Sequence, residues 1–484
     1  LKRESVAEFA ALQLQDPHLG IAQAENPRTV VVDFSSPNVA KPMHVGHIRS
    51  TVLGDAVARL LRSAGHNVIT DNHLGDWGTQ FGKIIYGWKH HLDQENLAKD
   101  PIGEMERLYK LVNAQSESDE AIADAARAET AKLQNGDAEN KAIWDQLREY
   151  SQEQFDEMYG RLNVNFDYTL GESFYNDELA GVVEDLQQRG LAKGSDGAMI
   201  VPFDDIPALA DKPLLIQKRD GSFLYGTTDL ATIKYRQNEW HANEILYVVD
   251  ARQSLHFQQL FETSKRANYT NATLRHISFG SILGDDGTPI KTRSGESVKL
   301  RDLLDEAESR ALEIVQEKNA ALDPEIQKQV AKAVGIGAIK YADLSQNRVS
   351  DYIFSWERML AMQGNTAPYL MYAYVRIRSI MRQSESTFDA GKVLLLEEDA
   401  AFELAKFALR FGEAVGRSLK DYRPTALCAY LFHLAQKFTT FYDACPVRSS
   451  EEPLRSSRLQ LCQLTADILQ RGLGLLGIET VEQM

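Results

Sequence analysis

The fold is decided by residues 30–70, which read VVVDFSSPNVAKPMHVGHIRSTVLGDAVARLLRSAGHNVIT. The run at 30–36 is apolar and β-branched and stops at Ser-Ser-Pro-Asn, so it predicts a buried strand that ends in a turn. A helical pattern follows and should end near Gly65, and residues 67–70 predict a second strand. The apolar face of this helix is formed by Ile48, Val52, Ala56 and Leu60. Strand, helix and strand in this order form a βαβ unit, which builds parallel sheets with ligands at the carboxyl ends of the strands.

The rest of the chain predicts more strands and then a change to helices. Residues 91–160 are polar, acidic and helical in period, which predicts a helical insertion. From about residue 300 the period is almost entirely helical, with breaks near Asn365–Pro368 and Tyr422–Pro424. Further strands are predicted at 198–203, 213–217, 245–249 and 276–283. The expected fold class is a split α/β domain followed by an all-α domain.

Length and composition are those of an average soluble globular protein. The chain has 484 residues, of which 43% are hydrophobic and 25% charged. A helix that spans a bilayer needs about 20 consecutive apolar residues, and no such run is present. The cysteines, Cys428, Cys445 and Cys462, are odd in number and far apart, which predicts reduced thiols and neither a disulfide framework nor a zinc site. We therefore expect a cytoplasmic protein with no membrane segment.

The net charge is unevenly distributed along the chain. The formal charge is −16, because the chain has 53 lysines and arginines and 69 aspartates and glutamates. Residues 91–160 alone hold 17 acids and 7 bases, which accounts for −10 of it. By contrast, the stretch between Glu357 and Glu385 contains no acidic residue. It contains four arginines, Arg358, Arg376, Arg378 and Arg382. A polyanion could approach that part of the chain; ordinary solvated charge is the alternative.

The string His44-Val45-Gly46-His47 follows the first predicted strand and opens the helix. Two imidazoles three positions apart lie on one face of the first turn, where free N–H groups and the helix dipole favour a phosphate. Gly46 would let a nucleotide approach the backbone closely, and Lys41 adds a cation. A pair of ordinary surface histidines is the alternative. The position after a strand, and the lack of a competing phosphate-binding or HExxH motif, favour function.

Two further groups of residues are candidates for chemistry. Residues 284–295 form a Gly-rich hairpin and a basic loop, in which Lys291 and Arg293 could neutralise a triphosphate as pyrophosphate leaves. A plain surface hairpin is the alternative. The carboxylates Glu172 and Asp229 could each cap a helix. If they share a pocket they would bind a cation, and a guanidinium suits a bidentate carboxylate.

Motifs in consistent order cover the chain from about residue 25 to its end. They are SSPNVAKPMHVGHIRSTVLGDAVARLL, NHLGDWGTQFG, LYGTTDLATIKYR, YVVDARQSLHFQQ, AVGIGAIKYADLSQNRVSDYIFSW, GNTAPYLMYAYVRIRS and GLGLLGIETVEQM. The sequence thereby resembles class I aminoacyl-tRNA synthetases, and among them the arginyl-tRNA synthetases. The resemblance implies a Rossmann-like parallel-sheet catalytic domain with a helical connective insertion, followed by an all-α anticodon-binding bundle.

The resemblance also implies domain boundaries. Residues 1–24 would be a residual N-terminal helix or linker, and 25–300 the catalytic domain, with its insertion at about 88–165. Residues 301–355 would be a helical connecting region, and 356–484 the anticodon-binding domain.

The activity implied by the resemblance is that of an arginine–tRNA ligase. Such an enzyme activates L-arginine with ATP to arginyl-adenylate, releases pyrophosphate, and transfers arginine to the 3′ end of tRNA(Arg). Mg²⁺ bound with the ATP, no zinc, no membrane and a monomer are implied as well. The alternative is a catalytically retired, tRNA-binding or regulatory descendant. Such a protein should have lost some site residues, and all of them are present.

Roles carry over to the matching positions. The implied catalytic residues are His44, His47, Lys41, Lys291 and Arg293, and ATP binding is implied for His44, Gly46, His47 and Lys291. The implied arginine-binding residues are Ser36, Asn38, Glu172, Tyr225, Asp229 and Gln253. The tRNA-binding residues would be Tyr369, Tyr372, Arg376 and Met484, with core packing as the alternative for the aromatic ones.

The sequence departs from the family pattern at two places. The signature loop KMSKS stands here as Lys291-Thr292-Arg293-Ser294-Gly295 and lacks the second lysine. Arginyl enzymes often share this lack, and Lys41 would stand in for it. Most members also carry an N-terminal domain that contacts tRNA, whereas here LKRESVAEFAALQLQ predicts only a helix. The chain would then be cut short or naturally short, with weakened tRNA binding.

Overall fold

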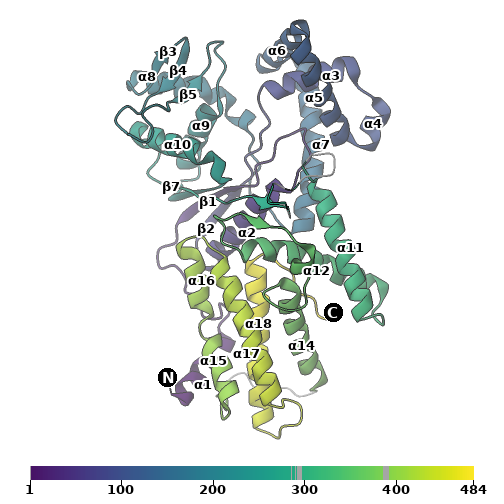
Figure 1. The fold of residues 1–484 in the computed structure, drawn as a ribbon. Coiled ribbons are helices and arrows are strands. Elements are labelled where there is room, and N and C mark those ends of the chain that lie inside the picture. Colours follow the sequence, from purple (N-terminus) through teal and green to yellow (C-terminus); the bar gives the residue numbers. More distant parts are fainter. Residues whose placement is uncertain (1, 285, 289, 291–296, 385–391) are drawn as a thin grey trace. The chain divides into compact units, whose positions relative to one another are not determined.

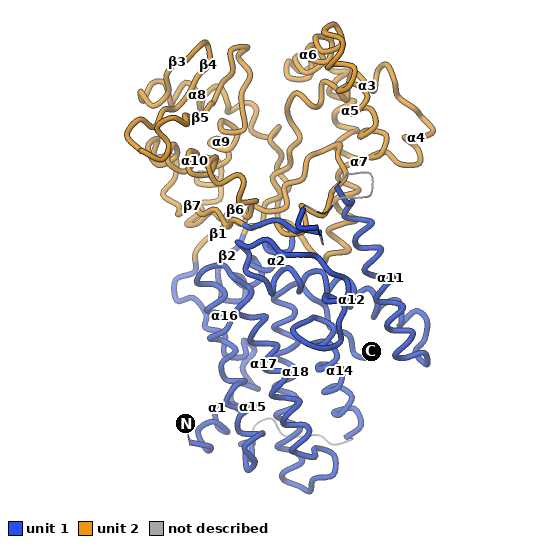
Figure 2. Tube along the Cα trace, in the orientation of Figure 1, with its two compact units in different colours: residues 1–27, 51–68, 279–484 blue, residues 28–50, 69–278 orange. Residues whose placement is uncertain are grey.

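The computed structural model describes residues 2–284, 286–288, 290, 297–384 and 392–484. The chain divides into two compact units (Figure 2). Unit 1 comprises residues 1–27, 51–68 and 279–484, and unit 2 comprises residues 28–50 and 69–278.

A four-stranded sheet has the strand order β2-β1-β6-β7 (Figure 1). Its strands are β1 (Thr29–Phe34), β2 (Asn67–Asp71), β6 (Glu244–Val248) and β7 (Thr273–His276). β1 and β6 are parallel, from Val30 opposite Glu244 to Phe34 opposite Val248, and β6 is parallel to β7. Every residue of β6 and nearly every residue of β1 is buried, as expected for parallel strands covered on both faces. The strands predicted at 30–36, 67–70 and 245–249 are confirmed.

Helix α2 (Gly46–Ser63) follows β1 along the chain, as predicted. Its predicted apolar face is buried along its whole length, at Ile48, Val52, Ala56 and Leu60. Gly65 lies just beyond the helix with φ +82°, a backbone conformation that glycine adopts without steric cost.

The polar, acidic stretch of the sequence forms helices. These are α3 (Thr79–His91), α4 (Gln94–Lys99), α5 (Pro101–Ser118), α6 (Glu120–Gln134) and α7 (Ala138–Leu162). Four of them begin after an aspartate whose side chain accepts a backbone N–H of the first turn, namely Asp93, Asp100, Asp119 and Asp137. Some of the acidic residues of this region therefore serve as helix caps.

The remainder of unit 2 holds a second, separate sheet. Strands β3 (Lys193–Ser195), β4 (Ala198–Val201) and β5 (Leu214–Gln217) are antiparallel. The runs predicted at 198–203 and 213–217 are strands, but they do not join the parallel sheet. The helices here are η1 (Glu172–Glu178), α8 (Leu179–Gln188), α9 (Tyr225–Asn238), η2 (Ala251–Gln253) and α10 (Ser254–Ala267).

The prediction of one strand at 276–283 is wrong. β7 ends at His276, and β8 (Ile282–Leu283) pairs instead with β9 (Tyr352–Ile353) in unit 1. The backbone around Gly280 packs so closely that a Cβ there would lie 2.5 Å from Oδ1 of Asp351. An apolar run does not specify which strand it will pair with, so the sequence did not show that residues 276–283 are shared between two sheets.

Unit 1 is largely helical. Besides most of α2, it holds α1 (Arg3–Gln15), α11 (Leu300–Lys318), α12 (Pro324–Leu344), α13 (Trp356–Met359), α14 (Ala367–Gln383), α15 (Asp399–Ala408), α16 (Phe411–Lys420), α17 (Thr425–Ala444) and α18 (Leu454–Leu475). Helices α14, α17 and α18 pack side by side (Figure 1). The predicted breaks are present: α14 begins after Thr366, and Tyr422, with φ +52°, separates α16 from α17.

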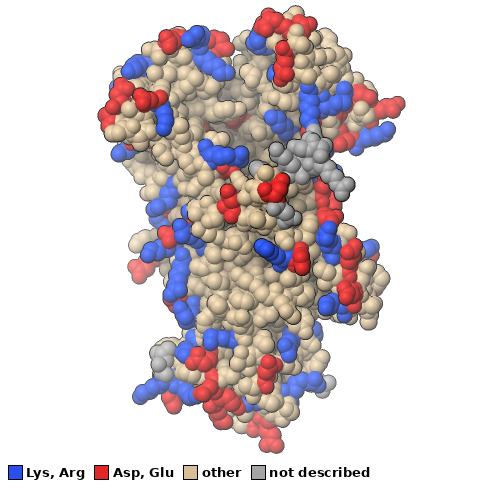
Figure 3. Space-filling view, viewed as in Figure 1, with Lys and Arg blue, Asp and Glu red and all other residues tan. Residues whose placement is uncertain are grey.

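Charged side chains of both signs are interspersed on the face that Figure 3 shows. None of the helices in the described ranges is long and apolar enough to cross a membrane.

Candidate active site

The HVGH segment leads into α2, which begins at Gly46, so His44 and Val45 lie just before the helix. The ring centroids of His44 and His47 are 4.0 Å apart. The backbone N–H of His44 donates to Nδ1 of His47, and that of Gly46 donates to Nδ1 of His44, each at 3.1 Å. Because both Nδ1 atoms accept a hydrogen bond, each neutral ring carries its proton on Nε2.

The electrostatic surroundings keep both rings neutral at pH 7. Burial, with the charges of Arg252 and Lys41, lowers the pKa of His44. Burial and the neighbouring His44 lower the pKa of His47 to about 3. Neutral imidazoles can hydrogen-bond to phosphate oxygens without changing protonation state near neutral pH. The Nζ of Lys41 lies 5.0 Å from the centroid of the Tyr109 ring.

Gly46 has a steric role within this turn. A Cβ at this position would lie 2.8 Å from Cε1 and 2.9 Å from Nδ1 of His44. The glycine is thus needed for the observed position of the His44 ring, whether or not a nucleotide approaches the backbone there.

The turn after β1 holds two of the residues predicted to bind arginine. Ser36 has φ +49°; its N–H donates to Oδ1 of Asn72, and its hydroxyl donates to Oδ1 of Asp33, each at 3.1 Å. Asn38 forms a β-bridge with Gly75, where a Cβ would lie 2.2 Å from Oδ1 of Asn38. Such left-handed conformations persist only where the surrounding structure holds them, and they are common at functional sites.

A buried ion cluster beside this turn was missed in the sequence. Nη2 of Arg236 lies 2.6 Å from Oδ2 of Asp33 and 2.7 Å from Oδ2 of Asp71. The cluster joins the ends of β1 and β2 to α9. The available signal was a charge within each apolar strand, as in VVVDF and NVITD, but spacing along the chain could not show that both acids share one arginine.

Glu172 and Tyr225 line the same cavity of about 410 Å³ in unit 2. Burial and the charges of Asp229 and Asp76 raise the pKa of Glu172 to about 8. Tyr225 opens α9 and is 67% exposed, and Asp229 follows one turn later on the same helix face. Asp229 does not itself line the cavity. A bound cation would relieve the repulsion between these carboxylates.

Asp229 has a partner that the sequence analysis did not single out. Its Oδ2 lies 2.5 Å from Nε2 of His256. Burial alone would lower the pKa of His256, but the hydrogen bond and the charge of Asp229 raise it. His256 follows Gln253 by three residues, and Gln253 is exposed at the end of η2. This spacing from a predicted site residue was the only signal for His256 in the sequence.

The residues predicted to bind tRNA lie in unit 1. Tyr372 is 47% exposed on α14. Tyr369 packs against another aromatic ring, and the guanidinium of Arg376 lies 4.1 Å from the centroid of the Tyr442 ring. The carbonyl oxygen of Met484 accepts a hydrogen bond from the side chain of Asn319. Tyr372 therefore offers the most exposed ring of the predicted set.

Lys291 and Arg293 lie outside the described residues. Within the ranges that are described, no group of three or more His, Cys, Asp or Glu side chains could hold a metal ion.

Comparison with known proteins identifies two family domains. The family described as tRNA synthetases class I (R), catalytic domain, matches residues 9–356. The DALR anticodon binding domain matches residues 370–484. The parallel sheet lies within the first match, and helices α15 to α18 lie within the second.

Individual relatives agree with the family match. An arginine–tRNA ligase of Cellvibrio japonicus is 45% identical over 100% of this chain and 85% of its own length. One of Shewanella loihica is 47% identical over 97% of this chain and 82% of its own length. Among solved structures, Plasmodium falciparum arginyl-tRNA synthetase has a TM-score of 0.81 at 32% identity, covering 99% of this chain and 83% of that one. Thermus thermophilus arginyl-tRNA synthetase has a TM-score of 0.84 at 25% identity, covering 100% and 86%. The chain belongs to the class I arginyl-tRNA synthetase family.

Proposed function

We propose that the protein is an arginine–tRNA ligase that activates L-arginine with ATP and transfers it to the 3′ end of tRNA(Arg). The observation that carries this proposal is the acidic site of unit 2. Glu172 and Tyr225 share one cavity there, and the charge of Asp229 acts on Glu172. A paired acidic site selects a cation, and a planar guanidinium can form bidentate hydrogen bonds that the compact ammonium of lysine cannot.

The first reaction needs no protein nucleophile. An oxygen of the arginine carboxylate attacks the α-phosphorus of ATP, forming the adenylate, and the bond from that phosphorus to the pyrophosphate oxygen breaks. The protein contributes position and charge stabilisation. His44 and His47 would donate from Nε2 to phosphate oxygens, consistent with Nδ1 of each being occupied as an acceptor. Lys41, Lys291 and Arg293 are proposed to neutralise the leaving pyrophosphate.

Recognition through hydrogen bonds to the guanidinium would make the enzyme selective. A site built to bond a substrate N–H rejects analogues that lack it, because its buried polar groups are left unpaired. Ser36, Asn38 and Gln253 are proposed to contact the remainder of arginine. The hydroxyl of Ser36 already donates to Asp33, so it is oriented before substrate arrives.

Several parts of the proposal rest on family membership. ATP and tRNA(Arg) are proposed substrates, and Tyr369, Tyr372, Arg376 and Met484 are proposed tRNA contacts. Mg²⁺ would enter with the nucleotide, because it commonly binds through substrate phosphates and retained waters. We assign no reaction step to it. The monomeric state, the cytoplasmic location and the domain boundaries predicted from the sequence stay predictions.

The test is arginine-dependent exchange of pyrophosphate into ATP, measured with and without tRNA, with lysine as the control amino acid. Exchange with arginine and not with lysine supports the proposal, and a requirement for tRNA would add that this chain engages tRNA productively. No exchange in either condition, together with retained tRNA binding, would instead identify a catalytically retired descendant.

A further inference from the structure

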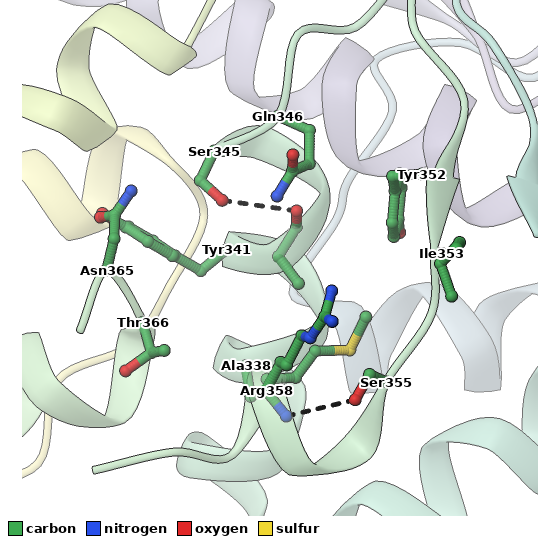
Figure 4. Close-up of a pocket in the computed structure, with 12 residues that line it drawn as sticks. Ala338, Tyr341, Ser345, Gln346, Tyr352, Ile353, Ser355, Arg358, Asn365 and Thr366 are labelled. Carbon is green, nitrogen blue, oxygen red and sulfur yellow. Dashed lines mark hydrogen bonds between the residues drawn. The ribbon is translucent and has the colours of Figure 1, made fainter. Parts of the chain in front are cut away.

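A second cavity lies in unit 1, and its described lining includes none of the residues of the proposed adenylation site. Its volume is about 320 Å³, within the range of small-ligand pockets of roughly 300–1,000 Å³. It is bordered by the carboxyl-terminal part of α12, strand β9, helix α13 and the residues before α14 (Figure 4). No function is assigned to this cavity by the proposal above.

The lining of this cavity carries a positive charge and side-chain amides. Arg358 is its only charged lining residue among those described, and none of the described lining residues is acidic. Figure 4 shows the Arg358 side chain extending into the space between α12 and Tyr352. The amides of Gln346 and Asn365 also line the cavity. A matching ligand would therefore supply negative charge for Arg358 and polar groups for the two amides.

Arg358 differs from the other arginines of the acid-free stretch. Arg376 lies over the Tyr442 ring at 4.1 Å. Arg378 and Arg382 approach Oε2 of Glu482 at 3.1 and 3.5 Å. For Arg358, the described residues provide neither an ion pair nor an aromatic ring contact to the guanidinium. Its charge is thus available to an external anion.

The wall opposite Arg358 is held in place by hydrogen bonds within the protein. Tyr341 is 1% exposed, and its hydroxyl lies 2.6 Å from Oδ1 of Asn365 and 2.9 Å from the carbonyl oxygen of Cys428. Thr366 caps α14, and its hydroxyl donates to the carbonyl oxygen of Ala361 at 2.6 Å. Because the Tyr341 hydroxyl has one proton, it donates to only one of these two oxygens, and these contacts fix the position of the Asn365 side chain beside the cavity. The cavity is therefore preorganised on this side.

We propose that this cavity binds one nucleotide of the tRNA, with its phosphate on Arg358, its base against Tyr352 and its polar base edge at Gln346 and Asn365. This inference rests on the proposed function, which supplies the RNA. A strand of RNA fits better than a free anion, because the cavity combines a phosphate-binding cation with an aromatic ring and amides suited to a base.

The test compares Arg358→Gln with Arg417→Gln. Arg417 is an exposed arginine of unit 1 that is ion-paired with Glu413 within α16, so it is the matched control. Equilibrium binding of tRNA(Arg) transcript is titrated at several KCl concentrations. For Arg358→Gln we expect weaker binding and a slope of log K against log salt reduced by about 0.7–0.9, the value for one phosphate contact. The KM values for arginine and ATP at saturating tRNA should not change, and Arg358→Lys should restore most of the slope.

A second measurement separates a nucleotide pocket from diffuse attraction. Hydroxyl-radical footprinting of the wild-type complex should show one protected position that is lost in Arg358→Gln and kept in Arg417→Gln. Tyr352→Leu, checked for folding by thermal unfolding, should weaken tRNA binding by about 5- to 150-fold, the range for loss of one stacked base. An unchanged footprint and salt slope in Arg358→Gln, with wild-type protein that charges tRNA, would overturn the pocket alone. Wild-type protein that neither charges nor binds tRNA would overturn both proposals.

Discussion

Replacement of Asp229 should weaken arginine binding far more than ATP binding. Asp229→Ala removes one of the two carboxylates proposed to bind the guanidinium, and we expect the KM for arginine to rise by the equivalent of about 2–5 kcal/mol, as for loss of one partner of a desolvated charge pair. The KM for ATP should change far less. Steady-state exchange kinetics measure both values, with Asp205→Ala, an exposed carboxylate of the same unit, as control. Equal changes for the two substrates would refute the guanidinium assignment.

Glu172 should make arginine binding depend on pH. Its pKa of about 8 lies above the ordinary value, so the side chain is mostly protonated and uncharged at pH 7. A guanidinium binds the carboxylate form, so arginine affinity should increase as the pH rises through about 8, with release of about one proton per arginine at pH 7. Calorimetry in buffers of different ionisation enthalpy measures that proton. Glu172→Gln should abolish its release; release that persists in this variant would come from another group.

His47 should contribute to kcat, but its own titration should not appear in the pH dependence of kcat. We expect His47→Ala to lower kcat by roughly 10²-fold, as for other single transition-state donors. Because burial and His44 lower the pKa of His47 to about 3, the wild-type pH–rate profile should lack a limb from this residue near neutral pH. Single-turnover adenylate formation across pH measures both effects. An unchanged kcat would remove His47 from the mechanism.

At the scale of elements, the first turn of α2 is shaped by Gly46. The Cβ of Gly46→Ala would lie 2.8 Å from the His44 ring and displace it. We expect kcat to fall on the order of 10²-fold, since displacement of catalytic groups by about 1 Å has effects of this size. The control is Gly181→Ala in α8, where a Cβ meets nothing within 4 Å. Comparable kcat losses in both variants, or an unchanged thermal midpoint and kcat in Gly46→Ala, would argue against this steric role.

At the scale of the whole molecule, the carboxyl-terminal segment of unit 1 is tied to helices far away in the sequence. Nζ of Lys340 donates to the carbonyl oxygen of Gly477 at 2.7 Å and lies 3.8 Å from Oδ2 of Asp55. Burial lowers the pKa of Lys340 to about 8. This contact joins α2, α12 and the segment after α18 within one unit.

Gly477→Ala should destabilise this junction. Gly477 has φ +70°, and a Cβ would lie 2.5 Å from Oδ2 of Asp55 and 2.8 Å from Nζ of Lys340. We expect a loss of about 1–3 kcal/mol from the backbone conformation, increased by the steric contacts. Gly474→Ala in α18, where nothing lies within 4 Å, should instead be neutral or stabilising by up to about 1 kcal/mol. Urea unfolding followed by circular dichroism measures the difference, and equal stabilities would contradict it.

The sequence by itself determined the βαβ start, the helical second half and the membership of the family, because each depends on local periodicity or on motifs of consecutive residues. It also placed His44, Gly46 and His47 in one turn, since they are neighbours in the chain. Only the tertiary structure decided which distant residues meet. The pairing of Asp229 with His256, the sharing of Arg236 by Asp33 and Asp71, and the transfer of β8 to unit 1 all depend on long-range packing. The physical reason is that residue spacing along the chain specifies which side of one helix or strand a side chain occupies, whereas the partner it meets across space is set by how separate elements pack.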